Sequence, residues 1–287
     1  MDQFLVRVPD HLGDGVMAIP AVRAISEVGP VQIVGPKWSN RLYANIATDV
    51  PFEANVAVLF KPSFSAAWKT RHLPRRIGHR GDWRSWLLTD PVRRRNGHRT
   101  EDYAALAQMV NATVLGPPTF ETTIEEKQIT KNIPAHSVLL LPLSNSQATV
   151  GWKSFRHLAD HLGGRAIFAA GPGECEALQN IAGIHPCLPP LPVGQFGAVA
   201  QHVSAVVGND SGLSHLASAA RRAVGLRADS IHVFFGSTTP HHTGPIGCTV
   251  HQNEPLSCQP CYRKQCRTTG DAPCLDIGMT NILQAIH

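Results

Sequence analysis

Short apolar runs alternate along the chain with segments of helical periodicity. The runs are rich in Val, Ile and Leu and lie at Phe4–Val8, Val31–Gly35, Val56–Phe60, Val138–Pro142, Ala166–Gly171, Ala205–Gly208 and Ile231–Gly236. The intervening helical segments include Ala18–Val28, Tyr103–Val110, Phe155–Leu162 and Leu213–Arg221. Continuous rather than alternating apolar strands, interleaved with helices, are typical of parallel sheets that helices cover on both faces. The pattern predicts an α/β protein.

The alternation pauses at Gly116–Ala135, which contains three prolines and little apolar periodicity. We interpret this segment as a linker between two Rossmann-like domains, residues 1–130 and 131–287. A chain of 287 residues is long enough for two domains that each bury a core. Ligands in such folds bind at the carboxyl ends of the strands.

Composition narrows the class of protein. The chain is 43% hydrophobic and 16% charged, as in a globular protein. No apolar run approaches the ~20 residues of a membrane-spanning helix, and the start, MDQFLVRVPD, does not resemble a signal peptide. Seven cysteines, an odd number, do not suggest a secreted disulfide scaffold. We therefore expect a cytoplasmic location.

The positive charge is concentrated in one segment. Residues 61–99 hold eleven Lys and Arg and only two acids, a local balance of +9 in a chain whose net charge is +5. Such a segment suits an anionic glycolipid, a membrane surface or nucleic acid, although a solvated surface explains it almost as well. Trp68, Trp83 and Trp86 lie within it and could stack on bases. No nucleic-acid-binding fold pattern accompanies them, so we expect no nucleic-acid partner.

The first candidate motif is Leu12-Gly13-Asp14-Gly15, after the first predicted strand. Its glycines permit a tight turn with positive φ and a close approach to a ligand. A carboxylate at Asp14 could take the proton of an attacking hydroxyl as a general base. Alternatively, Asp14 only caps the helix that follows.

The second motif runs from Val207 to Ala217, where a strand enters a small polar loop and then a helix. Backbone N–H groups at the start of that helix, with the Ser211 hydroxyl and Gly212, could bind a diphosphate. Asp210 is either a helix cap or an acceptor for a sugar hydroxyl. His215 lies near the loop and is either structural or functional.

Two weaker candidates follow other strands of the second half. Lys153, in the loop after Val138–Pro142 and close to Thr149, could supply a point charge to a phosphate. Glu174 follows the Gly171-Pro172-Gly173 turn, where a carboxylate could bind a ribose diol.

In this order, these segments resemble glycosyltransferase family 9, the ADP-heptose:lipopolysaccharide heptosyltransferases. The strongest parts are Leu12-Gly13-Asp14, Asp210–His215, Phe235–Pro240 and Thr243-Gly244-Pro245, with the closing Cys258-Gln259-Pro260-Cys261. The resemblance implies a GT-B fold, in which two Rossmann-like domains with parallel sheets face each other across a cleft. It also implies an ADP-heptose donor, a lipid A–Kdo/heptose core acceptor, inversion without a required metal, and peripheral association with the cytoplasmic face of the inner membrane.

The resemblance also assigns roles to residues. By position, Asp14 resembles the catalytic base, and Lys153 with Thr149 the phosphate clamp. Glu174 resembles the ribose contact. The donor pocket is expected at Asp210, Ser211, Gly212 and His215, and the acceptor contacts at Lys61, Arg93, Arg94 and Arg95.

The cysteines near the end leave two interpretations open. Cys258, Cys261, Cys266 and Cys274 could bind a structural metal tetrahedrally, as related protein heptosyltransferases do, or remain reduced thiols. Two further functions also stay open: transfer of heptose to a protein side chain, and a catalytically silent GT-B-like protein that binds a nucleotide sugar.

Overall fold

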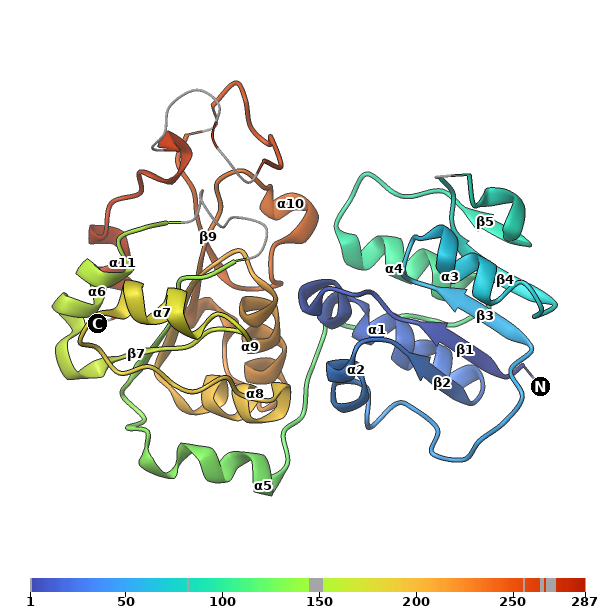
Figure 1. The fold of residues 1–287 in the computed structure, drawn as a ribbon, viewed down its shortest axis with the longest axis horizontal. Helices are drawn as coiled ribbons and strands as arrows, with labels where there is room; N and C mark the ends of the chain where they lie inside the picture. Colours follow the sequence, from blue (N-terminus) through green and yellow to red (C-terminus); the bar gives the residue numbers. More distant parts are fainter. Residues whose placement is uncertain are drawn as a thin grey trace. The chain divides into compact units, whose positions relative to one another are not determined.

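The chain forms two compact units, Met1–Pro118 and Thr119–His287. The computed structural model describes residues 2–81, 83–144, 152–254, 256–263, 266 and 272–286. Each unit is built around its own five-stranded parallel sheet (Figure 1). Residues 119–130, predicted to belong to the first domain, belong to the second unit. The segment interpreted as a linker contains helix α5 (Ile124–Lys127) and a 3₁₀ helix, Gln128–Asn132.

The sheet of the first unit has the strand order β2-β1-β3-β4-β5. Its elements are β1 (Phe4–Arg7), α1 (Leu12–Val28), β2 (Val31–Val34), α2 (Lys37–Leu42), β3 (Val56–Leu59), α3 (Phe64–Lys69), β4 (Arg75–His79), a 3₁₀ helix at Ser85–Leu87, β5 (Asp90–Val92) and α4 (Arg99–Gln108).

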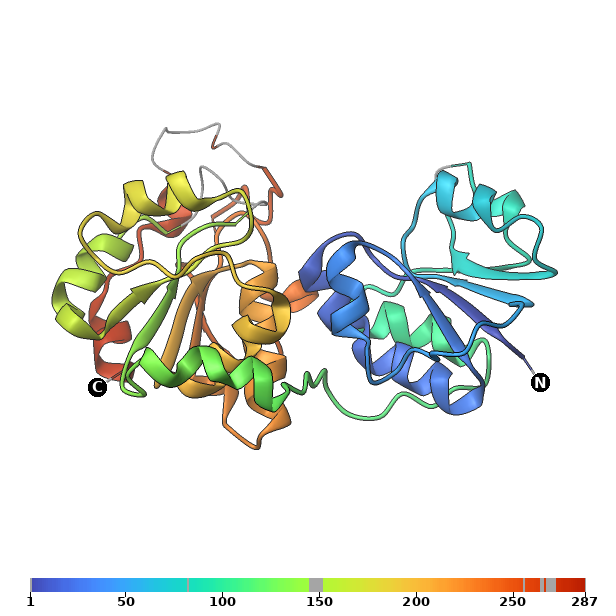
Figure 2. The same ribbon diagram turned by 60° about the horizontal axis from the view of Figure 1, so that its bottom comes forward.

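Helices cover both faces of this sheet because alternate residues of each strand point in opposite directions. On β3, Ala57 and Leu59 form a buried cluster with Ala67 of α3. α1 and α4 pack together on the other face (Figure 2), where Phe60 contacts the ring of Tyr103. The predicted α/β layering is confirmed for this unit.

The second unit repeats this topology, with the strand order β10-β9-β8-β6-β7. Its further elements are β6 (Val138–Leu141), α6 (Phe155–Leu162), a 3₁₀ helix at Gly163–Arg165, β7 (Ala166–Phe168), α7 (Cys175–Ala182), α8 (Val193–His202), β8 (Ala205–Asn209), α9 (Gly212–Ala223), a 3₁₀ helix at Ala228–Ser230, β9 (Ile231–Phe234), α10 (Pro240–Thr243), β10 (Thr249–His251), a 3₁₀ helix at Pro273–Leu275 and α11 (Thr280–Ile286).

Helices cover both faces of the sheet in this unit as well. Side chains of α6, α7 and α11 form a buried cluster there with β6 and β8, while α8 and α9 pack together on the opposite side (Figure 1). Trp152 stacks on Phe234 with 4.1 Å between ring centroids. None of the described helices is long and apolar enough to cross a membrane.

The two sheets share one topological property that positions the candidate sites. In each, the first strand of the unit lies between the second and third, so the chain leaves adjacent strands toward opposite faces. This switch point lies between β1 and β3 in the first unit and between β6 and β8 in the second. Open parallel sheets bind ligands at the carboxyl ends of the strands at such points.

Candidate active site

Asp14 lies at the switch point of the first unit, in the first turn of α1. The predicted positive-φ turn is wrong: Leu12–Gly15 is already helical, and neither glycine has a positive φ. Gly15 instead allows close packing, because a Cβ there would lie 2.4 Å from Cη2 of Trp38. Asp14 is not the helix cap either. The residue that precedes the helix is His11, whose side chain makes no capping hydrogen bond.

The Asp14 carboxylate is held by a tyrosine of α4. The hydroxyl of Tyr103 donates a hydrogen bond to Oδ1 of Asp14 at 3.1 Å. Tyr103 is buried, and burial, reinforced by the Asp14 charge, raises the pKa of its phenol well above its usual value. The phenol therefore keeps its proton and acts as a donor. A second buried tyrosine, Tyr43, donates to the backbone oxygen of Gly15 at 2.7 Å and fixes the same helical turn.

A small, partly open pocket beside this network shares Tyr103 with it. It is lined by Phe60, Pro62, His79, Arg94, Arg99, Asp102 and Tyr103. These residues follow β3, end β4, follow β5 or belong to α4, so the pocket lies at the carboxyl ends of the strands.

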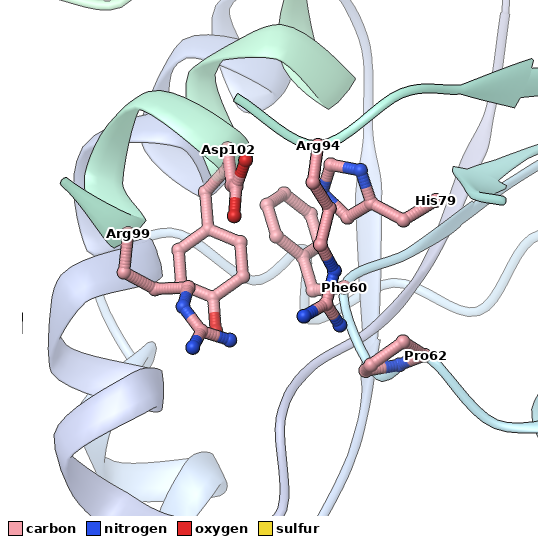
Figure 3. Close-up of a pocket in the computed structure, with 7 residues that line it drawn as sticks. Phe60, Pro62, His79, Arg94, Arg99 and Asp102 are labelled. Carbon is pink, nitrogen blue, oxygen red and sulfur yellow. The ribbon is translucent and has the colours of Figure 1, made fainter. Parts of the chain in front are cut away.

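The pocket carries more positive than negative charge. In Figure 3 the guanidinium groups of Arg94 and Arg99 point toward the same end of the pocket, and the Asp102 carboxylate lies at the other. Asp102 accepts a hydrogen bond from the backbone N–H of Arg95 at 2.7 Å. Burial lowers the pKa of His79, so its ring is neutral at pH 7. Neither ring nitrogen has a hydrogen-bond partner of good geometry in the described part of the chain.

The four predicted acceptor residues do not form one group. Arg94 lines the pocket and Arg93 is exposed. Lys61 forms an ion pair with Asp10 instead. The guanidinium of Arg95 donates to the side chain of Gln108 at 3.1 Å.

In the second unit, Asp210, Ser211, Gly212 and His215 come together where β8 leads into α9. Ser211 caps the helix, its hydroxyl accepting from the N–H of Ser214 at 3.4 Å, so Asp210 is not the cap. The buried Asp210 carboxylate accepts a hydrogen bond from the hydroxyl of Thr238 at 2.8 Å.

Asn209 ties the two strand ends of this switch point together. Its side chain donates to the backbone oxygen of Pro142 at 2.7 Å and accepts from the N–H of Trp152 at 2.9 Å. The indole N–H of Trp152 donates to the backbone oxygen of Ile277 at 2.8 Å. Lys153 is exposed and directly follows this anchored residue. Its predicted neighbour Thr149 lies outside the described residues.

Glu174 is engaged by its own turn. One carboxylate oxygen accepts a hydrogen bond from the N–H of Gly171 at 2.7 Å. Between them Gly173 has φ +84°, which favours glycine. The Glu174 carboxylate therefore stabilises the turn that follows β7, in addition to any contact that it makes with a ligand.

The sequence profile of glycosyltransferase family 9 (heptosyltransferase) matches residues 53–270. The chain belongs to this family. The match includes the pocket residues of the first unit and the β8–α9 loop of the second, and it begins after Asp14. No curated protein matches the sequence significantly.

Solved structures share the fold of this family 9 glycosyltransferase. Escherichia coli ADP-heptose lps heptosyltransferase II superposes with a TM-score of 0.78 at 20% identity, over 99% of this chain and 97% of that chain. E. coli heptosyltransferase WaaC with ADP gives 0.66 at 16% identity, over 98% of both chains. The iron-containing dodecameric glycosyltransferase TibC of enterotoxigenic E. coli gives 0.57 at 16% identity, over 91% of this chain and 64% of that chain. The GT-B class predicted from the resemblance is confirmed.

The four cysteines near the end of this glycosyltransferase lie close enough for their charges to interact. Cys258, Cys261, Cys266 and Cys274 are all in the reduced form. Burial raises the pKa of Cys274, and the nearby thiols of the other three raise it further. Within the described ranges, however, no three His, Cys, Asp or Glu side chains are arranged to hold a metal ion.

Five residues that line the pocket or make these hydrogen bonds were not predicted as site residues: His79, Arg99, Tyr103, Asn209 and Thr238. Arg99 ends the basic segment, and Asn209 and Thr238 stand inside motifs that were already conspicuous. Tyr103 begins a predicted helix, but the sequence does not indicate that it contacts Asp14, which is distant in the chain. His79 lies in β4, a strand without an apolar run.

Proposed function

We propose that this chain transfers a heptose from ADP-heptose to the inner core of lipopolysaccharide, with inversion at the anomeric carbon. The observation that carries the proposal is the position of Asp14. It lies at a topological switch point, and its carboxylate is held by Tyr103, which also lines a pocket that contains two arginines. Heptosyltransferases of known structure share the fold of the whole chain and support the choice of donor.

The proposed reaction needs one proton transfer. A hydroxyl oxygen of the acceptor attacks the anomeric carbon of the heptose while Asp14 takes its proton. The bond from that carbon to the β-phosphate oxygen breaks on the opposite side, and ADP leaves with the electron pair. A sugar hydroxyl is a weak nucleophile until its proton is removed, so a positioned carboxylate contributes typically about 10²–10⁴-fold to the rate.

We assign the donor to the switch point of the second unit. The N–H groups at the start of α9 and the Ser211 hydroxyl suit a diphosphate, because a helix N-terminus attracts anions. Lys153 adds a positive charge as ADP departs. Asp210 and His215 shape the pocket beside the sugar, and Glu174 binds the ribose. In this proposal, protein groups neutralise the leaving diphosphate and no metal is required.

We assign an anionic group of the lipid A–Kdo/heptose acceptor to the pocket of the first unit. Arg94 and Arg99 provide charge-assisted hydrogen bonds, which are roughly twice as strong as neutral ones. The neutral His79 ring lines the same pocket and adds no charge to it. We further propose that the reaction takes place at the cytoplasmic face of the inner membrane, where such an acceptor would be presented.

The proposal is tested by incubating the protein with ADP-heptose and a detergent-dispersed, heptose-free inner-core glycolipid. We expect ADP release together with a glycolipid that gains one heptose. Release only with a protein acceptor would favour the protein heptosyltransferase. The absence of release with every acceptor, while ADP still binds, would favour a catalytically silent nucleotide-sugar-binding protein.

A further inference from the structure

Three aromatic side chains lie exposed together on the first unit: Phe64, Trp68 and Trp86, here called the aromatic patch. Phe64 and Trp68 are four positions apart on α3, so they share one helix face, and their rings stack with centroids 6.1 Å apart. Trp86 belongs to the 3₁₀ helix Ser85–Leu87, and its ring centroid lies 6.4 Å from that of Phe64. Their exposed fractions are 45%, 44% and 67%.

The patch is not explained by the core of the unit. The opposite face of α3 carries the buried Ala66 and Ala67, which complete its packing against the sheet. Large aromatic side chains contribute much to stability when buried and little when exposed. A contiguous exposed group of them marks a binding surface more often than a scattered apolar residue does.

Positive charge lies beside the patch. The guanidinium of Arg71 lies 4.4 Å from the centre of the Trp68 ring. Lys69 and Arg80 are exposed on the same stretch of chain. Arg84, on the same stretch, is buried and adds no charge to this surface. A partner for this surface should combine negative charge with an apolar layer just beneath it.

We propose that the aromatic patch, with Lys69 and Arg71, docks the protein on the surface of a bilayer that contains anionic phospholipids. Tryptophan favours the membrane–water interface because its ring is apolar and its N–H polar. Basic side chains add attraction to anionic headgroups, about fivefold in partitioning for each one near the surface. None of the described helices could span a membrane, and docking through the aromatic patch would bring the protein to a membrane-bound acceptor. In assuming such an acceptor, this inference rests on the proposed function.

Docking is measured by sedimentation of the full chain with vesicles of phosphatidylcholine alone or with 30% phosphatidylglycerol. These vesicles contain no acceptor glycolipid. We expect binding only to the anionic vesicles, weakening as salt rises because the charges are screened over about 8–10 Å. Trp68→Ala/Trp86→Ala should lower the partition coefficient roughly tenfold or more, since both rings lose their burial in the interface. Lys69→Gln/Arg71→Gln should lower it by about twenty-fivefold.

Matched controls come from equally exposed positions in the second unit. Ile184 is 97% exposed, and the side chain of Arg227 is 87% exposed. Ile184→Ala and Arg227→Gln should leave partitioning within twofold. Brominated acyl chains should quench the fluorescence of the parent protein and quench the Trp68→Ala/Trp86→Ala variant much less. This readout reports insertion of the patch itself.

The proposal is overturned if the parent does not bind anionic vesicles, or if the patch variants bind as tightly as the parent. It is also overturned if the patch variants lose affinity for a single-stranded oligonucleotide, or lose self-association, while vesicle binding is unchanged. Failure of docking with normal ADP release from a detergent-dispersed acceptor would leave the proposed function intact. Normal docking without turnover would instead count against the function alone.

Discussion

The hydrogen bond between Tyr103 and Asp14 gives a sharp prediction, because the same unit contains a matched tyrosine. Tyr103→Phe removes the hydroxyl that donates to the Asp14 carboxylate at 3.1 Å and leaves the buried ring in place. If the hydroxyl orients the carboxylate for proton transfer, the variant should lower kcat and leave ADP affinity unchanged.

Two opposing effects set the size of this change. A hydrogen bond to a charged group is worth ~1.5–3 kcal/mol. Because Asp14 is partly exposed, a water molecule can replace the lost donor and recover part of this energy. Misplacing a reacting group by 1 Å can cost about a hundredfold in rate. In the other direction, a carboxylate that loses a donor accepts protons more readily, which offsets part of the loss. We expect kcat to fall roughly tenfold, since misplacement is the larger effect.

Tyr43→Phe is the control. It makes the same chemical change next to the same helical turn, but the hydroxyl that it removes donates to the Gly15 backbone. The Gly15 oxygen keeps its helical hydrogen bond, so losing this second one should lower the free energy of unfolding by about 0.5–1.5 kcal/mol with kcat nearly unchanged. The assay is steady-state ADP release, with urea unfolding in parallel. Equal kcat in Tyr103→Phe and the parent, or an equal loss in both variants, would refute the positioning role.

Three further predictions concern the second unit. Lys153→Ala should weaken ADP binding tenfold or more, the worth of one charge-assisted contact; unchanged affinity by calorimetry would remove Lys153 from the donor site. Gly208→Ala should lower the free energy of unfolding by about 1–3 kcal/mol, because its Cβ would lie 2.9 Å from Oγ of Ser214 and 3.0 Å from Cβ of Leu141. Gly164→Ala, with no atom within 4 Å of its Cβ, is the control in urea unfolding, and equal losses would contradict this packing. Burial, with His251 nearby, lowers the pKa of His232 to about 4. Below about pH 6.5 the unfolded chain therefore takes up a proton at this histidine while the folded protein does not, and stability is lost as the pH falls toward 4. Urea unfolding should show a shallower loss over that interval for His232→Leu than for the parent, and parallel curves would exclude this linkage.

The sequence predicts most of the buried strands, since a parallel sheet covered on both faces requires continuous apolar runs. Three strands escape this rule. β4 reads Arg-Arg-Ile-Gly-His and β5 contains a proline at the edge of the sheet, where a missing N–H is tolerated. β10 is three residues long and also an edge strand. These strands are held by their neighbours rather than by their own apolar pattern.

The candidate site was predictable where chemistry and chain position coincide, as at Asp14 and the β8–α9 loop. It was not predictable where a side chain acts through a residue distant in sequence. Tyr103 reaches Asp14 across 89 positions, and the basic segment does not reveal which arginines are free. Arg84, for example, is buried and donates to the backbone oxygen of His79 at 2.9 Å. Charge counted along the chain therefore overstates the charge available to a ligand.

In the proposed reaction, Asp14 is the base of a heptosyl transfer. The most direct test of this role is the turnover rate of Asp14→Asn with ADP-heptose and a heptose-free inner-core glycolipid. Asn keeps the shape and can still accept from Tyr103, but it cannot take up the proton. We predict a loss in kcat of roughly a hundredfold or more, with ADP affinity and thermal stability close to those of the parent. Turnover of Asp14→Asn at the rate of the parent would contradict the claim.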